Sequence, residues 1–98
     1  MPFVYILRCA DNTLYVGHTT DLASREDCHN RGVAVAYTAA RRPVRIVYSE
    51  THDSLEAAVR RERQLKRWSA QKKEALIADD VLALKALSRR RRPSRKRR

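Results

Sequence analysis

Two short runs of mainly apolar residues near the N-terminus, separated by a polar stretch, predict a β-hairpin. Residues 3–9 (FVYILRC) and 13–17 (TLYVG) are rich in β-branched and aromatic residues, which favour strands. The residues between them, 10–12 (ADN), suit a three-residue loop, because asparagine tolerates the left-handed conformation that the last loop position requires. The pattern therefore predicts two antiparallel strands joined by a tight turn.

The length of this loop decides which side chains meet. Three residues pair Tyr5 with Gly17 and place Tyr5 and Tyr15 on one face of the hairpin. A two-residue loop would place the tyrosines on opposite faces, because side chains alternate along a strand. We predict the three-residue loop, in which Gly17 lets a backbone or a ligand approach the sheet opposite Tyr5.

Helical spacing and one further apolar run complete the pattern. We expect a third strand over residues 44–49, a loop over 31–43, and helices over about 21–30, 54–67, 70–78 and 80–88. Alternation in the third strand would bury Val44, Ile46 and Tyr48 on one face, or Arg45 and Val47 on the other. The expected fold class is α+β: a three-stranded antiparallel sheet with flanking helices in the order β-β-α-β-α-α, followed by the last short helix.

The helix over 54–67 carries a carboxylate on its apolar stripe. The stripe consists of Leu55, Ala58, Val59, Glu62 and Leu65. Burial of an unpaired charge is costly, so Glu62 needs a partner. The sequence leaves two alternatives for that partner, a buried arginine or a metal ion.

The helix over 21–30 places Leu22, Arg25, Glu26 and His29 on one face. Arg25 and His29 are one turn apart and can reach the same anion. The alternative interpretation is a solvated face on which Arg25 pairs with Glu26.

Several segments together resemble one known family. The triplets FVY at 3–5 and YVG at 15–17 resemble the paired triplets of the GIY-YIG nuclease superfamily. The stretches 21–30, 37–50 and 60–69 resemble its small, single-domain branch, so the resemblance covers roughly residues 3–78. Phe3 replaces the family's first glycine, Val16 replaces an isoleucine, and His18 stands where many relatives carry a lysine.

The resemblance implies hydrolysis of a phosphodiester by water with a single divalent ion, Mg²⁺ or Mn²⁺, held by Glu62. It implies that Arg25 grips a phosphate oxygen and that Tyr15 accepts the proton of the attacking water or orients that water. Tyr5 would be the hydrogen-bonded neighbour of Tyr15. His29 is a rival base, because an unperturbed histidine has a pKa near 6.5, whereas that of a free tyrosine is near 10. His18 is expected at a phosphate or at a metal-bound water.

Two functional classes follow from the resemblance. The first is an endonuclease acting on DNA in preference to RNA, selecting its substrate by structure rather than by sequence. The second is a nucleic-acid-binding protein on the same fold without useful catalysis. The full set Tyr5, Tyr15, Arg25, His29 and Glu62 favours the enzyme, whereas the small size and histidine in place of lysine at position 18 favour the binding protein. A third possibility is a subunit that cuts only beside a partner.

The charge distribution points to a polyanion as partner. Lys and Arg number 22 against 11 acidic residues, a net charge of +11. Residues 89–98 (RRRRPSRKRR) are almost entirely basic. We expect one domain over 1–88 and a disordered basic tail over 89–98. Candidate nucleic-acid contacts are His18, Arg41, Arg42, Arg45, Arg89, Arg90, Arg91 and Arg92; for Arg41, Arg42 and Arg45 the alternative is ordinary edge charges that discourage aggregation.

The remaining features concern the compartment. The N-terminal residues do not resemble a signal peptide, and no apolar run is long enough for a membrane span. Cys9 and Cys28 do not suggest a disulfide framework or a disulfide-linked partner, and zinc-ligand spacing is missing. We expect a protein of the reducing cytoplasm, with nucleoid association left open.

Overall fold

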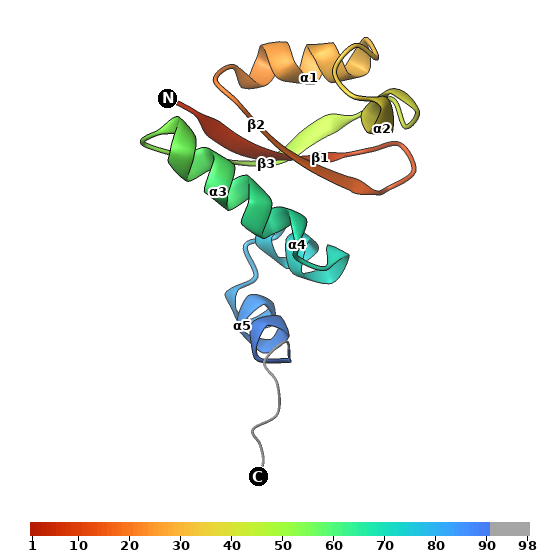
Figure 1. Ribbon diagram of the computed structural model, residues 1–98. Helices are drawn as coiled ribbons and strands as arrows, with labels where there is room; N and C mark the ends of the chain where they lie inside the picture. The colour runs from red at the N-terminus through yellow and green to blue at the C-terminus, as the bar shows by residue number, and fades with distance from the viewer. Residues whose placement is uncertain (91–98) are drawn as a thin grey trace. The chain divides into compact units, whose positions relative to one another are not determined.

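The computed structural model describes residues 1–90, with side chains described for residues 1–88. At its centre lies a three-stranded antiparallel sheet in the order β2-β1-β3 (Figure 1). The strands are β1 (Phe3–Arg8), β2 (Leu14–Thr19) and β3 (Arg45–Thr51). This arrangement confirms the expected α+β class and leaves β2 as an edge strand beside the hairpin turn.

The hairpin turn has the predicted three-residue loop. The Cys9 N–H donates to the Thr13 carbonyl at 2.9 Å, and Asn12 adopts a positive φ of 71°. The resulting register pairs Tyr5 with Gly17 and Leu7 with the second tyrosine, Tyr15. Both tyrosines therefore lie on the same face, as the loop length requires.

Three helices accompany this sheet in the part of the chain up to Arg67. Helix α1 (Leu22–Asn30) and the short α2 (Ala36–Ala39) lie on one side of the sheet, and α3 (Leu55–Lys66) crosses the other side (Figure 1). Asp21 and Ser54 cap α1 and α3 by accepting hydrogen bonds from backbone N–H groups of the first turn. Helix α2 lies in the segment for which only a loop was expected.

Strand β3 contains one more residue than its partner, which corrects the expected alternation. Leu7 pairs with Ile46, but its neighbour Ile6 pairs with Tyr48, so Val47 is the extra residue of a β-bulge. Ile46 packs against the core that contains Leu7, whereas Tyr48 lies on the face covered by α3. The expectation that Ile46 and Tyr48 share one face is therefore wrong.

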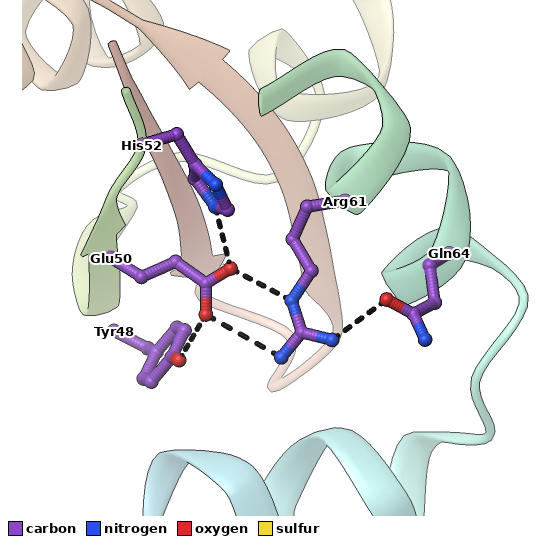
Figure 2. A network of polar contacts seen from close by, with 5 residues as sticks. All are labelled: Tyr48, Glu50, His52, Arg61 and Gln64. Atoms are coloured by element: carbon purple, nitrogen blue, oxygen red, sulfur yellow. Dashed lines mark hydrogen bonds and ion pairs between the residues drawn. The ribbon is translucent and has the colours of Figure 1, made fainter. Parts of the chain in front are cut away.

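A polar cluster ties β3 to α3. The Glu50 carboxylate accepts hydrogen bonds from Tyr48, from His52 Nε2 at 2.9 Å and from Arg61 Nε at 2.7 Å. Arg61 also donates to the Gln64 side chain at 2.8 Å (Figure 2). Burial raises the pKa of Glu50, but the hydrogen bonds from Arg61, Tyr48 and His52 lower it further, so the carboxylate is ionised. The ion pair fixes one side of α3 against the sheet.

The chain forms two compact units, and the second begins at Trp68. It contains α4 (Ala70–Ile77) and α5 (Val81–Arg90), with the expected break at Asp79 and Asp80 between them. Helix α5 ends two residues beyond the expected 88, and residues 91–98 lie outside the described part. The domain boundary expected at 88 stays a prediction.

Two structural observations concern the membrane span and the cysteines discussed from the sequence. No helix among the described residues is long and apolar enough to cross a membrane. Cys9 is buried in the core and Cys28 is half-buried, both as free thiols. The cytoplasmic location stays a prediction.

Candidate active site

A pocket of about 180 Å³ lies at the β2 edge of the first unit. It gathers side chains from β1, β2, α1 and α3, together with one residue that precedes α2. The lining residues are Tyr5, Tyr15, Gly17, His18, Arg25, His29, Val35 and Glu62. All five residues expected to be catalytic, and His18, therefore line one hollow.

Helix α1 brings Arg25 and His29 to this pocket because two of its other polar residues hold it to β3 and to the residue that precedes β3. The Glu26 carboxylate accepts from the Ile46 backbone N–H at 2.7 Å. The Asn30 side chain makes two hydrogen bonds with the Val44 backbone, at 2.7 and 2.8 Å. Glu26 is thus committed to the backbone of β3, and the surface pairing of Arg25 with Glu26 weighed as an alternative is not formed.

Arg25 is the cation of the pocket that remains available. Its side chain is exposed and forms no ion pair with the described residues. A guanidinium in this state can bind a phosphate oxygen through charge-assisted hydrogen bonds.

Tyr5 and His29 form a buried pair at the bottom of the pocket. Tyr5 is 2% exposed, His29 is 1% exposed, and the Tyr5 hydroxyl lies 2.9 Å from His29 Nε2, so its hydrogen-bond partner is His29 and not Tyr15 as expected. Burial and the nearby Tyr15 raise the pKa of Tyr5 above its usual range, although Arg25 opposes this. Burial, helped by Arg25, lowers the pKa of His29. Both side chains are therefore neutral at physiological pH.

The partners of the Glu62 carboxylate are a histidine and a lysine, not the buried arginine considered from the sequence. Its Oε1 contacts His18 Nδ1, and its Oε2 contacts Lys66 Nζ at 2.8 Å. Burial raises the pKa of Glu62, but the hydrogen bonds from Lys66 and His18 lower it further. The carboxylate, 15% exposed, is an anion inside the pocket.

Tyr15 is held by aromatic neighbours and lies near a cation. Its ring stacks on Tyr37 at 6.0 Å between centroids and meets the His29 ring edge-on at 5.4 Å. Lys66 Nζ lies 5.7 Å from the Tyr15 ring centroid. The Tyr37 ring in turn contacts the Arg41 guanidinium, which lies 3.9 Å from the ring centroid. Tyr37, to which the sequence assigned no role, thus helps to orient Tyr15.

Comparisons with known proteins show the family. A family model described as the GIY-YIG catalytic domain matches residues 1–75. The chain belongs to the GIY-YIG family. A UPF0213 protein of Natronomonas pharaonis is 46% identical over 79 residues, which are 81% of this chain and 93% of the relative. A UPF0213 protein of Staphylococcus aureus strain Mu3 is 43% identical over 77 residues, which are 79% of this chain and 94% of the relative.

A solved structure agrees with this assignment. The solution NMR structure of a UPF0213 protein from Bacillus halodurans aligns with a TM-score of 0.53 and 40% identity, over 82% of this chain and 86% of that chain. The protein is thus a small GIY-YIG protein. Membership in this nuclease family implies a nucleic acid as the substrate class.

The ligands in the GIY-YIG pocket suit a metal ion that is held by one carboxylate, rather than one enclosed by several protein side chains. Among residues 1–88, no group of three or more His, Cys, Asp or Glu side chains could enclose an ion. Glu62 offers a single ionised carboxylate, and Mg²⁺ commonly binds through one or two carboxylates together with waters and substrate phosphates. The donor set therefore fits an ion shared with substrate and water. Such an ion competes with His18 and Lys66 for the two oxygens of Glu62.

Three of the arginines predicted to contact nucleic acid, Arg41, Arg42 and Arg45, do not line the pocket. Arg41 donates to the Tyr37 carbonyl at 2.9 Å and lies 3.1 Å from the Asp11 carboxylate. Arg42 donates to the Ala39 carbonyl at 2.9 Å. Arg45 is exposed on β3. Arg41 and Arg42 thus hold the segment around α2. Nucleic-acid contacts by Arg41, Arg42, Arg45, Arg89 and Arg90 stay predictions, and Arg91 and Arg92 lie outside the described residues.

Three residues of the site were missed by the sequence reasoning. Lys66 follows Glu62 by four positions, so helical spacing alone could have identified it. Tyr37 and Thr38 reach the site through α2, and a helix of four residues leaves no periodic signal.

Proposed function

We propose that this GIY-YIG protein is a divalent-metal-dependent endonuclease that hydrolyses phosphodiester bonds in DNA. The observation that carries the proposal is the convergence of Arg25, Glu62 and two tyrosines, from four separate elements, on one pocket of about 180 Å³. A cation, an ionised carboxylate and hydroxyl groups in one hollow suit the binding of a phosphate and of a water molecule.

In the proposed reaction Arg25 binds a non-bridging phosphate oxygen and offsets the charge that develops on it. Glu62 holds Mg²⁺ or Mn²⁺. The bound ion supplies Lewis-acid activation of the phosphate and charge compensation for the leaving oxygen. His18, in contact with Glu62, lies where it can contact a phosphate or an ion-bound water.

The contacts of the candidate bases favour Tyr15 over His29. Both ring nitrogens of His29 are occupied, by Tyr5 and by Thr38, so neither is available to a water. The raised pKa of Tyr5 opposes its ionisation. Tyr15 lines the same pocket, and Lys66 Nζ lies 5.7 Å from its ring centroid. We assign the orientation or deprotonation of the attacking water to Tyr15.

We further propose that the enzyme selects DNA structure rather than sequence. The pocket lies at the edge of the sheet in a small unit. The net charge of +11, with eight basic residues in the last ten positions, favours contacts with the phosphate backbone.

One observation favours the alternative, a nucleic-acid-binding protein without catalysis. Both oxygens of Glu62 are already engaged, by His18 and by Lys66, so metal binding requires at least one of these contacts to break. Under this alternative the chain binds DNA through its basic surface but does not cut it.

A single experiment separates the two functions. The full chain is incubated with branched, single-stranded and linear DNA of matched sequence, and with an RNA of the same length, in Mg²⁺, in Mn²⁺ and in chelator. We expect cleavage of branched DNA in either metal and none in chelator. Binding without cleavage in both metals would support the alternative, and equal cleavage of all DNA forms would contradict structure selection.

A further inference from the structure

Thr38 is fully buried behind His29, on the side away from the pocket. Its Oγ1 lies 2.7 Å from His29 Nδ1 and 3.2 Å from the Val35 carbonyl oxygen. The other ring nitrogen of His29 contacts the Tyr5 hydroxyl at 2.9 Å. The four groups thus form one continuous hydrogen-bonded chain from the α2 backbone to the pocket.

The positions of the oxygens decide the direction of this chain. A threonine hydroxyl has one proton to donate, and the Val35 carbonyl can only accept. If the hydroxyl proton pointed at His29, two acceptor oxygens would face each other at 3.2 Å without a proton between them. The Thr38 hydroxyl therefore donates to Val35, a common contact for a helical threonine, and accepts from Nδ1–H of His29.

The proton on Nδ1 also decides the direction of the hydrogen bond at the other ring nitrogen of His29. A neutral histidine with its proton on Nδ1 has an acceptor at Nε2, so the Tyr5 hydroxyl must donate to His29. The single hydroxyl proton of Tyr5 is then used, and its oxygen presents only lone pairs to the pocket.

We propose that Thr38 is a positioning residue that fixes the tautomer of His29 and thereby makes the Tyr5 oxygen a hydrogen-bond acceptor inside the pocket. An acceptor at this place binds a proton of the attacking water and turns a lone pair of that water away from Tyr5. The catalytic part of this inference rests on the proposed nuclease function, whereas the tautomer itself does not.

The rest of the site makes the arrangement rigid. His29 and Tyr5 are almost completely buried, so bulk water does not compete for their polar atoms. The residue next to Thr38, Tyr37, stacks on Tyr15. The short helix α2 therefore supports both tyrosines of the pocket, one through a hydrogen-bonded chain and the other through a ring contact.

The direct test is the ¹⁵N NMR spectrum of the histidine rings in the full chain, recorded above the titration range of histidine. The chain has three histidines, so substitution of His18 and of His52 assigns the signals of His29. We expect His29 to carry its proton on Nδ1 in the parent protein. A parent protein with the proton on Nε2 would overturn the inference without any variant.

Two substitutions test whether Thr38 is the cause. Thr38→Val keeps the shape but removes both hydrogen bonds, and we expect it to lose the preference for the Nδ1–H form. Thr38→Ser keeps the hydroxyl and should retain the parent tautomer. An unchanged tautomer in folded Thr38→Val would assign the effect to Tyr5 and overturn the role of Thr38.

The kinetic readout separates this inference from the proposed function. We expect Thr38→Val to lower kcat by about 10- to 100-fold, by analogy with the loss of hydrogen-bond partners of metal-binding histidines, with KM unchanged. Thr38→Ser should stay near the parent. A parent chain that cuts nothing refutes the nuclease function, while the NMR spectrum still decides the role of Thr38.

Discussion

A methyl group added to Gly17 would collide with the ring of Tyr5. A Cβ atom at this position would lie 2.5 Å from the Tyr5 hydroxyl oxygen and 2.6 Å from Cζ. Carbon atoms pack best at about 3.5–4.0 Å, so the ring or the strand would have to move by about 1 Å. Tyr5 is 2% exposed and its hydroxyl is hydrogen-bonded to His29, so the ring has little freedom to move.

The expected loss of stability follows from these contacts. Overpacking of a tight interior costs about 1–3 kcal/mol, and a misaligned buried hydrogen bond costs about 1 kcal/mol more. Gly17→Ala should therefore destabilise the fold by about 2–4 kcal/mol. In a domain of this size each kcal/mol lowers Tm by about 4–8 °C, which makes the shift easy to measure.

The assay is urea unfolding of Gly17→Ala and of a matched control, Ser49→Ala, at an exposed position of β3. The control should change stability by less than about 0.5 kcal/mol. Adding Tyr5→Phe removes the atom nearest to the new methyl but leaves Cζ close, so it should relieve the clash only in part. A Gly17→Ala variant as stable as the control would refute the reasoning.

Two further predictions concern charge. Glu50→Gln removes the carboxylate charge that Arg61 Nε contacts at 2.7 Å and should destabilise the protein by about 2–3 kcal/mol at neutral pH (Figure 2). Because the folded-state pKa of Glu50 is lowered, its contribution is complete above the unfolded-state pKa of about 4.3 and is lost as the pH falls through the folded value. Urea titrations should therefore show a difference between parent and variant that shrinks in acid; a difference independent of pH would contradict the assignment. Deletion of residues 89–98 should weaken binding to all DNA sequences alike and flatten its salt dependence, since each phosphate contact adds about −0.9 to the log–log slope. An unchanged slope in a salt titration would exclude the tail from binding.

The hairpin could be predicted because local chemistry fixes its register. Asn12 at the left-handed position selects the loop length, and the loop length alone decides that Tyr5 and Tyr15 share a face. The bulge at Val47 could not be predicted in this way. Where a strand accommodates an extra residue depends on its pairing with β1, and the alternation of β3 alone fits either arrangement.

The sequence indicated that Glu62 needs a partner but not which one. A carboxylate in an apolar stripe signals that need, and helical spacing could have identified Lys66 four residues later, although the sequence analysis did not name it. His18 comes from a strand far away in the sequence, so only the folded arrangement brings it to Glu62. The contacts of Thr38 with His29 are likewise tertiary. Arg41 and Arg42, predicted as phosphate contacts, bind carbonyl groups around α2, which their basic character alone does not reveal.

The central claim, metal-dependent cleavage in this pocket, is tested most directly by the cleavage rate of Glu62→Gln across a titration of Mg²⁺ and Mn²⁺. Lys66 is 48% exposed, so loss of its partner should change stability by no more than about 1 kcal/mol, and a melt can establish that the variant is folded. We expect the folded variant to bind branched DNA in chelator at least as tightly as the parent and to have almost no cleavage at any metal concentration. A folded Glu62→Gln protein that cuts at the parent rate would contradict the claim.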